Sequence, residues 1–158
     1  MNDAAPAIGY APEEILTGEP TRSSRLKWVV VVAEALPAGR IVNAAVCVAA
    51  ATAAGVPGLL GPDAKDATGD LHPGLPWAGC TILAASSSRI AEIRAEAAAS
   101  QGVFVADMPG LAQLVRVYDG FLERMSAADA DELDYCAVSV VGPRKTVDRL
   151  VRGLSLLA

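Results

Sequence analysis

The stretch Lys27–Ala33 places four consecutive valines after a tryptophan, and it constrains the fold more than any other part of the chain. A strand with β-branched residues at successive positions has no polar face, which indicates that it is buried on both sides. Such a strand needs other elements to cover both faces of its sheet. The stretch therefore predicts the central strand of a layered domain.

Strands and helices alternate along the rest of the chain. Three further apolar runs predict strands, at 80–85, 103–106 and 135–141. Four segments predict helices, at 40–54, 89–100, 109–125 and from Gly142-Pro143 to Gly153. Asp107 is placed to cap the third helix. Because this alternation favours crossover connections, we predict an α/β fold with a mixed or mostly parallel sheet of about four strands and helices on both faces.

The length and composition fit one domain that follows a tail. A chain of 158 residues suffices for a single sizeable core. Residues 1–25 mix Ala, Pro, Gly, Ser and acidic residues without periodicity, which predicts a disordered tail before a single α/β domain at 26–158. The net charge of −5 argues against nucleic acid as a partner, because proteins that bind it usually carry a positive excess.

The three cysteines lie far apart, each inside an apolar run, and no CxxC pair or Cys/His cluster occurs. This spacing indicates free thiols in a reducing cytoplasm, without a disulfide framework or a metal site. There is no GxGxxG motif or P-loop, so we expect no cofactor. The most apolar segment, 41–54, is about 14 residues long and too short to span a bilayer, and no secretory signal is present, so we expect no membrane association.

Two stretches carry a family resemblance. They are Lys27–Ala50 and Tyr135–Leu157, the second with Gly142-Pro143 followed by Val147-Asp148-Arg149-Leu150 and Gly153-Leu154-Ser155-Leu156. They resemble the opening and closing segments of peptidyl-tRNA hydrolase type II. The closer similarity is to a bacterial family with that fold, the domain-of-unknown-function family 2000. A helix start like Asn43-Ala44-Ala45 and an ending like Gly142–Asp148 are characteristic of it. The resemblance spans residues 26–158 and implies the hydrolase-like fold.

The hydrolase residues are mostly replaced in this chain. In the hydrolases an aspartate follows the first strand, two lysines come next, and the helix carries a glutamine and a histidine. At those five positions stand, in order, Ala35, Arg40, Val42, Val46 and Ala49. Asp107 stands where a second hydrolase aspartate opens its segment. Hydrolysis of peptidyl-tRNA needs an activator for the attacking water and cations for the phosphates, and only one basic position is kept.

Arg40 and Asn43 lie one turn apart at the start of an otherwise apolar helix, so they face the same side. The free N–H groups of a helix start attract anions, and an arginine adds to this attraction. The pair therefore indicates a site for a small, anionic ligand. In the alternative interpretation Asn43 bonds the neighbouring loop and Arg40 lies in solvent.

The Gly/Pro-rich stretch 56–79 predicts a long irregular loop that carries Asp63, Asp66, Asp70 and His72. Such a group suits acid–base chemistry, and His72 is its best base, since imidazole titrates near neutral pH. The alternative is that the aspartates form turns and the histidine packs in the loop. The uneven spacing fits no metal pattern, so we expect no metal.

The last predicted helix carries a basic face formed by Lys145, Arg149 and Arg152. This face suits a phosphate or another anion, or it is simply solvated. Asp148 lies among these cations and is a candidate partner for one of them or for the loop near Asn43.

Three functions remain open. The first is binding of a small molecule by Arg40, Asn43, Asp70, Lys145 and Asp148, with His72 and Asp107 as candidate catalytic residues. The second is hydrolysis of an ester or an amide, peptidyl-tRNA being one case. The third is a non-catalytic domain that acts by self-association. Because apolar residues occupy more than one face of several elements, we expect a homodimer.

Overall fold

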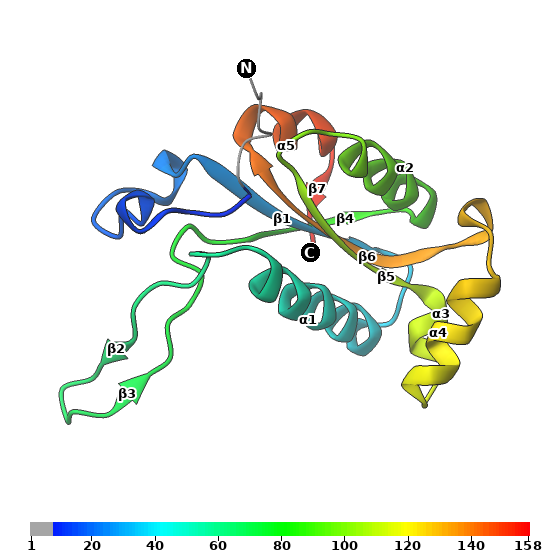
Figure 1. Cartoon of the computed structure of the whole chain (residues 1–158), viewed down its shortest axis with the longest axis horizontal. Helices are drawn as coiled ribbons and strands as arrows, with labels where there is room; N and C mark the ends of the chain where they lie inside the picture. The colour runs from blue at the N-terminus through cyan, green and yellow to red at the C-terminus, as the bar shows by residue number, and fades with distance from the viewer. Residues whose placement is uncertain (1–7) are drawn as a thin grey trace, which may run out of the picture.

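The computed structural model describes residues 8–158, and a five-stranded sheet runs through its centre (Figure 1). The strand order is β5-β6-β1-β4-β7. Their bounds are Leu26–Ala33 for β1, Thr81–Ala85 for β4, Phe104–Pro109 for β5, Tyr135–Pro143 for β6 and Ser155–Leu156 for β7. The valine strand β1 has neighbours on both sides, as its sequence predicts.

The sheet is mixed, but it is mostly antiparallel. Only β1 and β4 pair in parallel; β1–β6, β5–β6 and β4–β7 are all antiparallel. The prediction of a mixed sheet is confirmed, and the alternative of a mostly parallel sheet is wrong. The reason lies in residues 110–134, which stay at one end of the sheet: the N–H of Gly110 bonds the carbonyl of Asp134 at 3.0 Å. The chain therefore turns back beside β5 and does not cross over.

Helices cover both faces of the sheet. The helix α1 (Ala38–Gly55) lies on one face, and α2 (Ser87–Ala98) and α5 (Arg144–Leu150) lie on the other (Figure 1). Alternate β1 valines point to opposite faces, so Val30 and Val32 join the core on the α1 side. Val29 and Val31 join the core beneath α2 and α5. All four are at most 1% exposed, which explains why the strand needs no polar residue.

The predicted helix at 109–125 is two helices. They are α3 (Gly110–Leu114) and α4 (Tyr118–Ala127), separated by extended backbone at Val115 and Val117. Asp107 does not cap either of them, because β5 continues through Pro109 and Pro109 takes the cap position of α3. The β-branched valines at the break favour extended backbone over helix.

The predicted irregular loop contains a β-hairpin. The strands β2 (Ala64–Lys65) and β3 (Leu71–His72) pair with each other and stand away from the rest of the molecule (Figure 1). We call residues 60–76 the arm. Its base is closed by an antiparallel bridge between Leu60 and Pro76. The strands are two residues long, too short for any alternating pattern to appear in the sequence.

Residues 8–25 lie against the domain and do not form the disordered tail that the sequence predicts. They contain two short 3₁₀ helices, Pro12–Glu14 and Thr21–Ser23. Tyr10 is 6% exposed, its hydroxyl donates to the carbonyl of Leu26, and its ring meets Trp77 edge-on at 4.9 Å. Residues 1–7 of the predicted tail lie outside the described residues.

Candidate functional site

The two polar residues at the start of α1 are joined by a residue that the sequence analysis missed. Gln113, from α3, accepts a hydrogen bond from Nε of Arg40 at 2.6 Å. Its amide nitrogen donates to the Arg40 carbonyl at 3.0 Å and to Oδ1 of Asn43 at 3.3 Å. Arg40 and Asn43 therefore do face the same side, and they tie α3 to α1. A glutamine in a predicted helix gave no signal for this contact.

The aspartates and His72 lie on the arm, at the other end of α1. Asp66 shapes the hairpin turn: its Oδ1 accepts hydrogen bonds from the N–H groups of Thr68, Gly69 and Asp70. His72 meets the other Asp66 oxygen at 3.4 Å, with its side chain 62% exposed. An 18-residue helix, about 27 Å long, separates this group from Arg40 and Asn43. The structure therefore does not unite the two predicted halves of one pocket.

The remaining candidates are scattered over the surface. Asp107, on the edge strand β5, forms an ion pair with Arg94 of α2 at 3.0 Å, which raises the pKa of the arginine. Asp148 pairs with Lys27 at 2.6 Å, and Lys145 is exposed nearby on α5. Among residues 8–158, no three His, Cys, Asp or Glu side chains gather where they could hold a metal ion.

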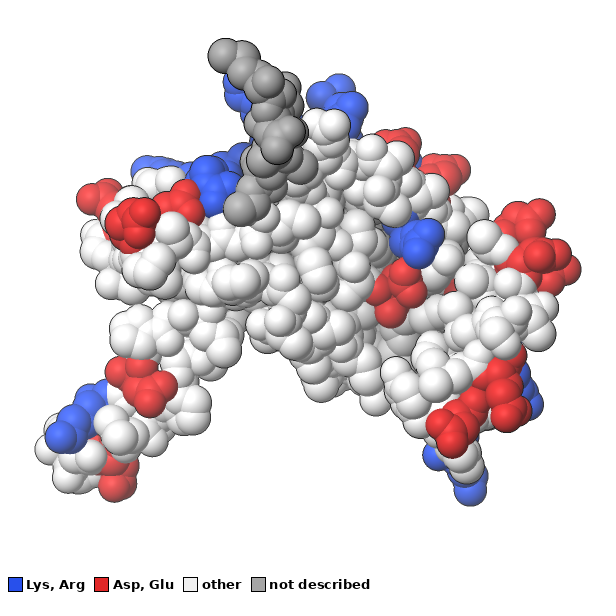
Figure 2. Space-filling model, in the orientation of Figure 1, with Lys and Arg blue, Asp and Glu red and all other residues white. Residues whose placement is uncertain are grey.

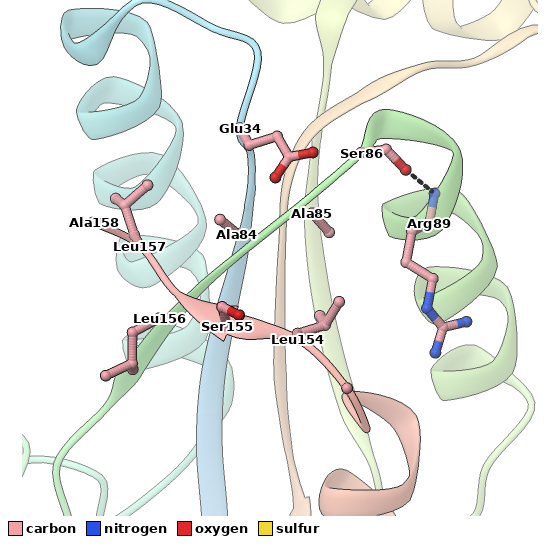
Figure 3. Close-up of a pocket in the computed structure, with 11 residues that line it drawn as sticks. Glu34, Ala84, Ala85, Ser86, Arg89, Leu154, Ser155, Leu156, Leu157 and Ala158 are labelled. Atoms are coloured by element: carbon pink, nitrogen blue, oxygen red, sulfur yellow. Dashed lines mark hydrogen bonds between the residues drawn. The ribbon is translucent and has the colours of Figure 1, made fainter.

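A cavity lies where the two parallel strands end. The chain leaves β1 for α1 on one face and leaves β4 for α2 on the other face. Ligands of α/β proteins bind in the crevice that such diverging connections leave at the carboxyl ends of the strands. Here the crevice is a cavity of about 530 Å³ (Figure 3). Its lining consists of Glu34, residues 84–86, Arg89 and residues 153–158.

Groups of opposite charge line this cavity. Glu34 follows β1 directly, and its N–H bonds the carbonyl of Ala85 at 3.0 Å. The residue is exposed and lines the cavity. Ser86 caps α2, where its hydroxyl accepts a hydrogen bond from the N–H of Arg89 (Figure 3). The Arg89 guanidinium is fixed by Glu92 at 2.9 Å and by the Leu150 carbonyl at 3.1 Å. The sequence revealed the serine cap, but it did not reveal that Glu34 would lie nearby.

The closing strand β7 completes the cavity. It pairs with β4 through Leu83–Leu156 and Ala84–Ser155, so the residues around it form one wall. The N–H of Leu157 bonds the carbonyl of Ile82 and holds this segment beyond the strand. Because β7 pairs with β4, the cavity is lined by two segments that lie about 70 residues apart in the chain.

Comparison with known proteins places the chain among proteins whose function is not established. A solved structure of a protein of unknown function from Agrobacterium tumefaciens strain C58 is similar in fold, with a TM-score of 0.72. The two sequences are 15% identical, and the similarity covers 85% of this chain and 98% of that one. No curated protein matches the sequence. The family model described as a protein of unknown function, DUF2000, matches residues 26–158, and the chain belongs to that family.

Proposed function

We propose that the domain binds a small polar molecule that carries both a positive and a negative group. The supporting observation is the cavity at the carboxyl ends of β1 and β4, which holds Glu34, the cap of α2 and Arg89. A volume of about 530 Å³ falls within the 300–1,000 Å³ that is usual for small-molecule sites. An acid and a base on one cavity would orient a ligand with two charged ends.

The two charges suit different ends of such a ligand. The exposed carboxylate of Glu34 would accept hydrogen bonds from an ammonium group. The first turn of α2 offers N–H groups, and Arg89 lies in that turn, so this side suits a carboxylate. Because Glu92 and Leu150 fix the guanidinium, little conformational freedom would be lost on binding. Free amino acids and short peptides are the simplest molecules with this pattern of charge.

The test is an NMR titration with a free amino acid, a dipeptide, an alkylamine and an alkyl carboxylate. We expect the two zwitterions to shift the amide signals of residues 84–86 and the single-charge compounds to bind far more weakly. Glu34→Gln should weaken zwitterion binding about tenfold, which corresponds to about 1.4 kcal/mol. The control Glu132→Gln changes an exposed acid on another part of the surface and should leave binding unchanged. Equal binding by both variants would contradict the proposal.

A peptidyl-tRNA hydrolase type II-like arrangement is a second proposal, and it concerns the fold more than the reaction. In its support, the two segments that carry the resemblance meet in the sheet, since β1 pairs with β6 along its length. The hydrolase fold does not imply hydrolase activity here, because the candidate base His72 lies on the arm and not at the cavity. We therefore expect no release of the peptide from a peptidyl-tRNA. We also expect no tRNA binding at physiological salt, because the net charge of −5 opposes contact with phosphates. Cleavage abolished by Glu34→Gln or Asp107→Asn would favour the hydrolase instead.

A further inference from the structure

The helix α1 is apolar on its outer side as well as its inner side. No charged residue occurs between Arg40 and Asp63. The inner side packs on the sheet, while Val42 and Val46 on the outer side are 60% and 61% exposed, and Ala50 continues the same row. A helix that is apolar all round is normally covered all round. After Asn43, the outer side of α1 therefore lacks the polar residues of a surface that faces water.

Apolar residues continue the exposed surface at both ends of α1. Leu71 and Leu75 on the arm are 67% and 77% exposed. Val117 and Tyr118, at the start of α4, are 66% and 73% exposed. We call the outer side of α1, together with the arm and the α3–α4 segment, the α1 face. Figure 2 shows this part of the molecule as largely uncharged and hollowed between the arm and α4, with charges gathered near their tips.

The molecule exposes more surface than a compact monomer of its mass. A globular protein of 16.2 kDa exposes about 7,500 Å², whereas this chain exposes 9604 Å². The excess is roughly 2,100 Å² for the whole chain. A stable protein interface covers about 800 Å² on each partner. The excess is therefore larger than the area that one interface needs, and the projecting arm and the uncovered α1 contribute to it.

We propose that the α1 face is the contact surface of a homodimer in which the two α1 helices cross antiparallel on a two-fold axis. The two ends of the face differ: α3 is tied to the start of α1 by Gln113, and the arm begins just after its end. A two-fold axis at the middle of α1 places the arm of one copy on the α3–α4 segment of the other. The exposed leucines of the arm then meet the exposed Val117 and Tyr118 of the partner, and each copy makes this contact once.

A second copy fits this face better than a membrane does. By length and composition alone α1 could cross a bilayer, because it has 18 residues, whereas the apolar segment expected to be too short covers only 41–54. Its inner side, however, packs on the sheet through Ile41, Ala44 and Val48. The face is hollow and a bilayer surface is flat, and the arm carries three aspartates against one lysine, which anionic lipids repel. A second copy offers a surface of the same apolar character, and its arm can reach across to the α3–α4 segment of its partner.

The first test is the mass of the particle in solution. Light scattering on the full chain should give twice 16.2 kDa. Ala50→Arg places a charge in the row of exposed apolar residues on α1 and should yield a folded monomer at the same concentration. The matched control is Ala95→Arg, which changes an exposed alanine within α2 on the opposite face of the sheet and should stay dimeric. Leu71→Asp, on the arm and far from the core, should weaken the dimer at least tenfold while each chain stays folded by circular dichroism.

The second test addresses the antiparallel crossing. Cys47 is exposed and lies at the midpoint of α1, so the two-fold axis brings two Cys47 thiols together. A short bismaleimide should link the two copies, and Cys47→Ser should abolish the link while Cys80→Ser preserves it. Although Cys80 reaches the surface, burial raises the pKa of its thiol to about 12, so it reacts slowly.

Three results would overturn the proposal. One is a wild-type chain that stays monomeric from low micromolar concentration upward. Another is a dimer that both Ala50→Arg and Leu71→Asp leave intact, or one that the bismaleimide fails to link through Cys47. The third is flotation of a monomeric wild-type chain with phosphatidylcholine and phosphatidylserine vesicles, lost in Ala50→Arg and kept in Ala95→Arg, because this would assign the α1 face to a lipid surface.

Discussion

Ser139→Ala should destabilise the protein by about 2–3 kcal/mol, although it removes a single oxygen atom. Ser139 is fully buried in β6. Its hydroxyl accepts a hydrogen bond from Nε1 of Trp28 at 2.8 Å and lies 2.7 Å from the hydroxyl of Thr52. The Thr52 hydroxyl in turn donates to the carbonyl of Val48 at 2.7 Å. This chain of hydrogen bonds joins the sheet to the buried side of α1.

The magnitude follows from which group loses its partner. Thr52 keeps its bond to Val48, but the indole N–H of Trp28 is left buried without an acceptor, which costs roughly 1–3 kcal/mol. The full burial of Ser139 places the cost in the upper part of that range. The resulting 2–3 kcal/mol should lower the melting temperature by about 4–12 °C in a domain of this length. Among the described residues, every buried side-chain nitrogen or oxygen atom has a partner, so nothing else in the core masks the effect.

The assay is urea unfolding followed by circular dichroism at one fixed protein concentration, because dimerisation would couple stability to concentration. The deciding measurement is a double-mutant cycle with Trp28→Phe, which removes the indole donor. In that background Ser139→Ala should cost less than half as much, since no buried donor remains to be stranded. An equal cost in both backgrounds, or a cost below about 0.5 kcal/mol for the single variant, would refute the reasoning.

Two further predictions concern the segments outside the sheet. Gly74→Ala should weaken dimerisation in light scattering while the chain stays folded by circular dichroism, because an added methyl would overlap the Gly61 carbonyl oxygen at the base of the arm. The hydrogen bond from Arg25, aided by the Ala11 N–H, lowers the pKa of Glu14 from 4.5 to about 2. The ionised carboxylate of Glu14 therefore contributes fully to the docking of residues 8–25 above about pH 5, and this contribution is lost as the pH falls towards 2. In an NMR titration Glu14→Gln should remove that transition, and a transition that survives would assign it to another acid.

Local patterns in the sequence predicted the elements of the core well. The valine run of β1 and the apolar helix α1 required no knowledge of their neighbours, and both lie near the predicted bounds. The sheet order could not be predicted, because it depends on which distant strands pair. The hairpin of the arm was not predicted, because β2 and β3 have only two residues each and the sequence around the Asp66 turn is typical of a loop.

The candidate site was harder to predict than the fold. Arg40 and Asn43 were correctly placed on one side of α1, but their partner Gln113 comes from a helix about 70 residues later. The cavity beside Glu34 depends on the pairing of β7 with β4, and no pattern in either segment predicts that the two strands pair. Both are consequences of tertiary packing, which a single sequence does not display.

The pairing of β1 with β6 has a consequence for how the chain folds as it is synthesised. Val29 pairs with Val140, about 110 residues later in the chain. A contact between such distant residues requires closure of a long loop, and the chain loses that entropy before the contact stabilises it. Such contacts therefore form late, and the domain folds slowly. Until β6 leaves the ribosome, the valine strand has an open edge and no helix can fully enclose it. Newly made chains should therefore be prone to aggregation and should depend on chaperones for a longer time than a helical domain of the same length.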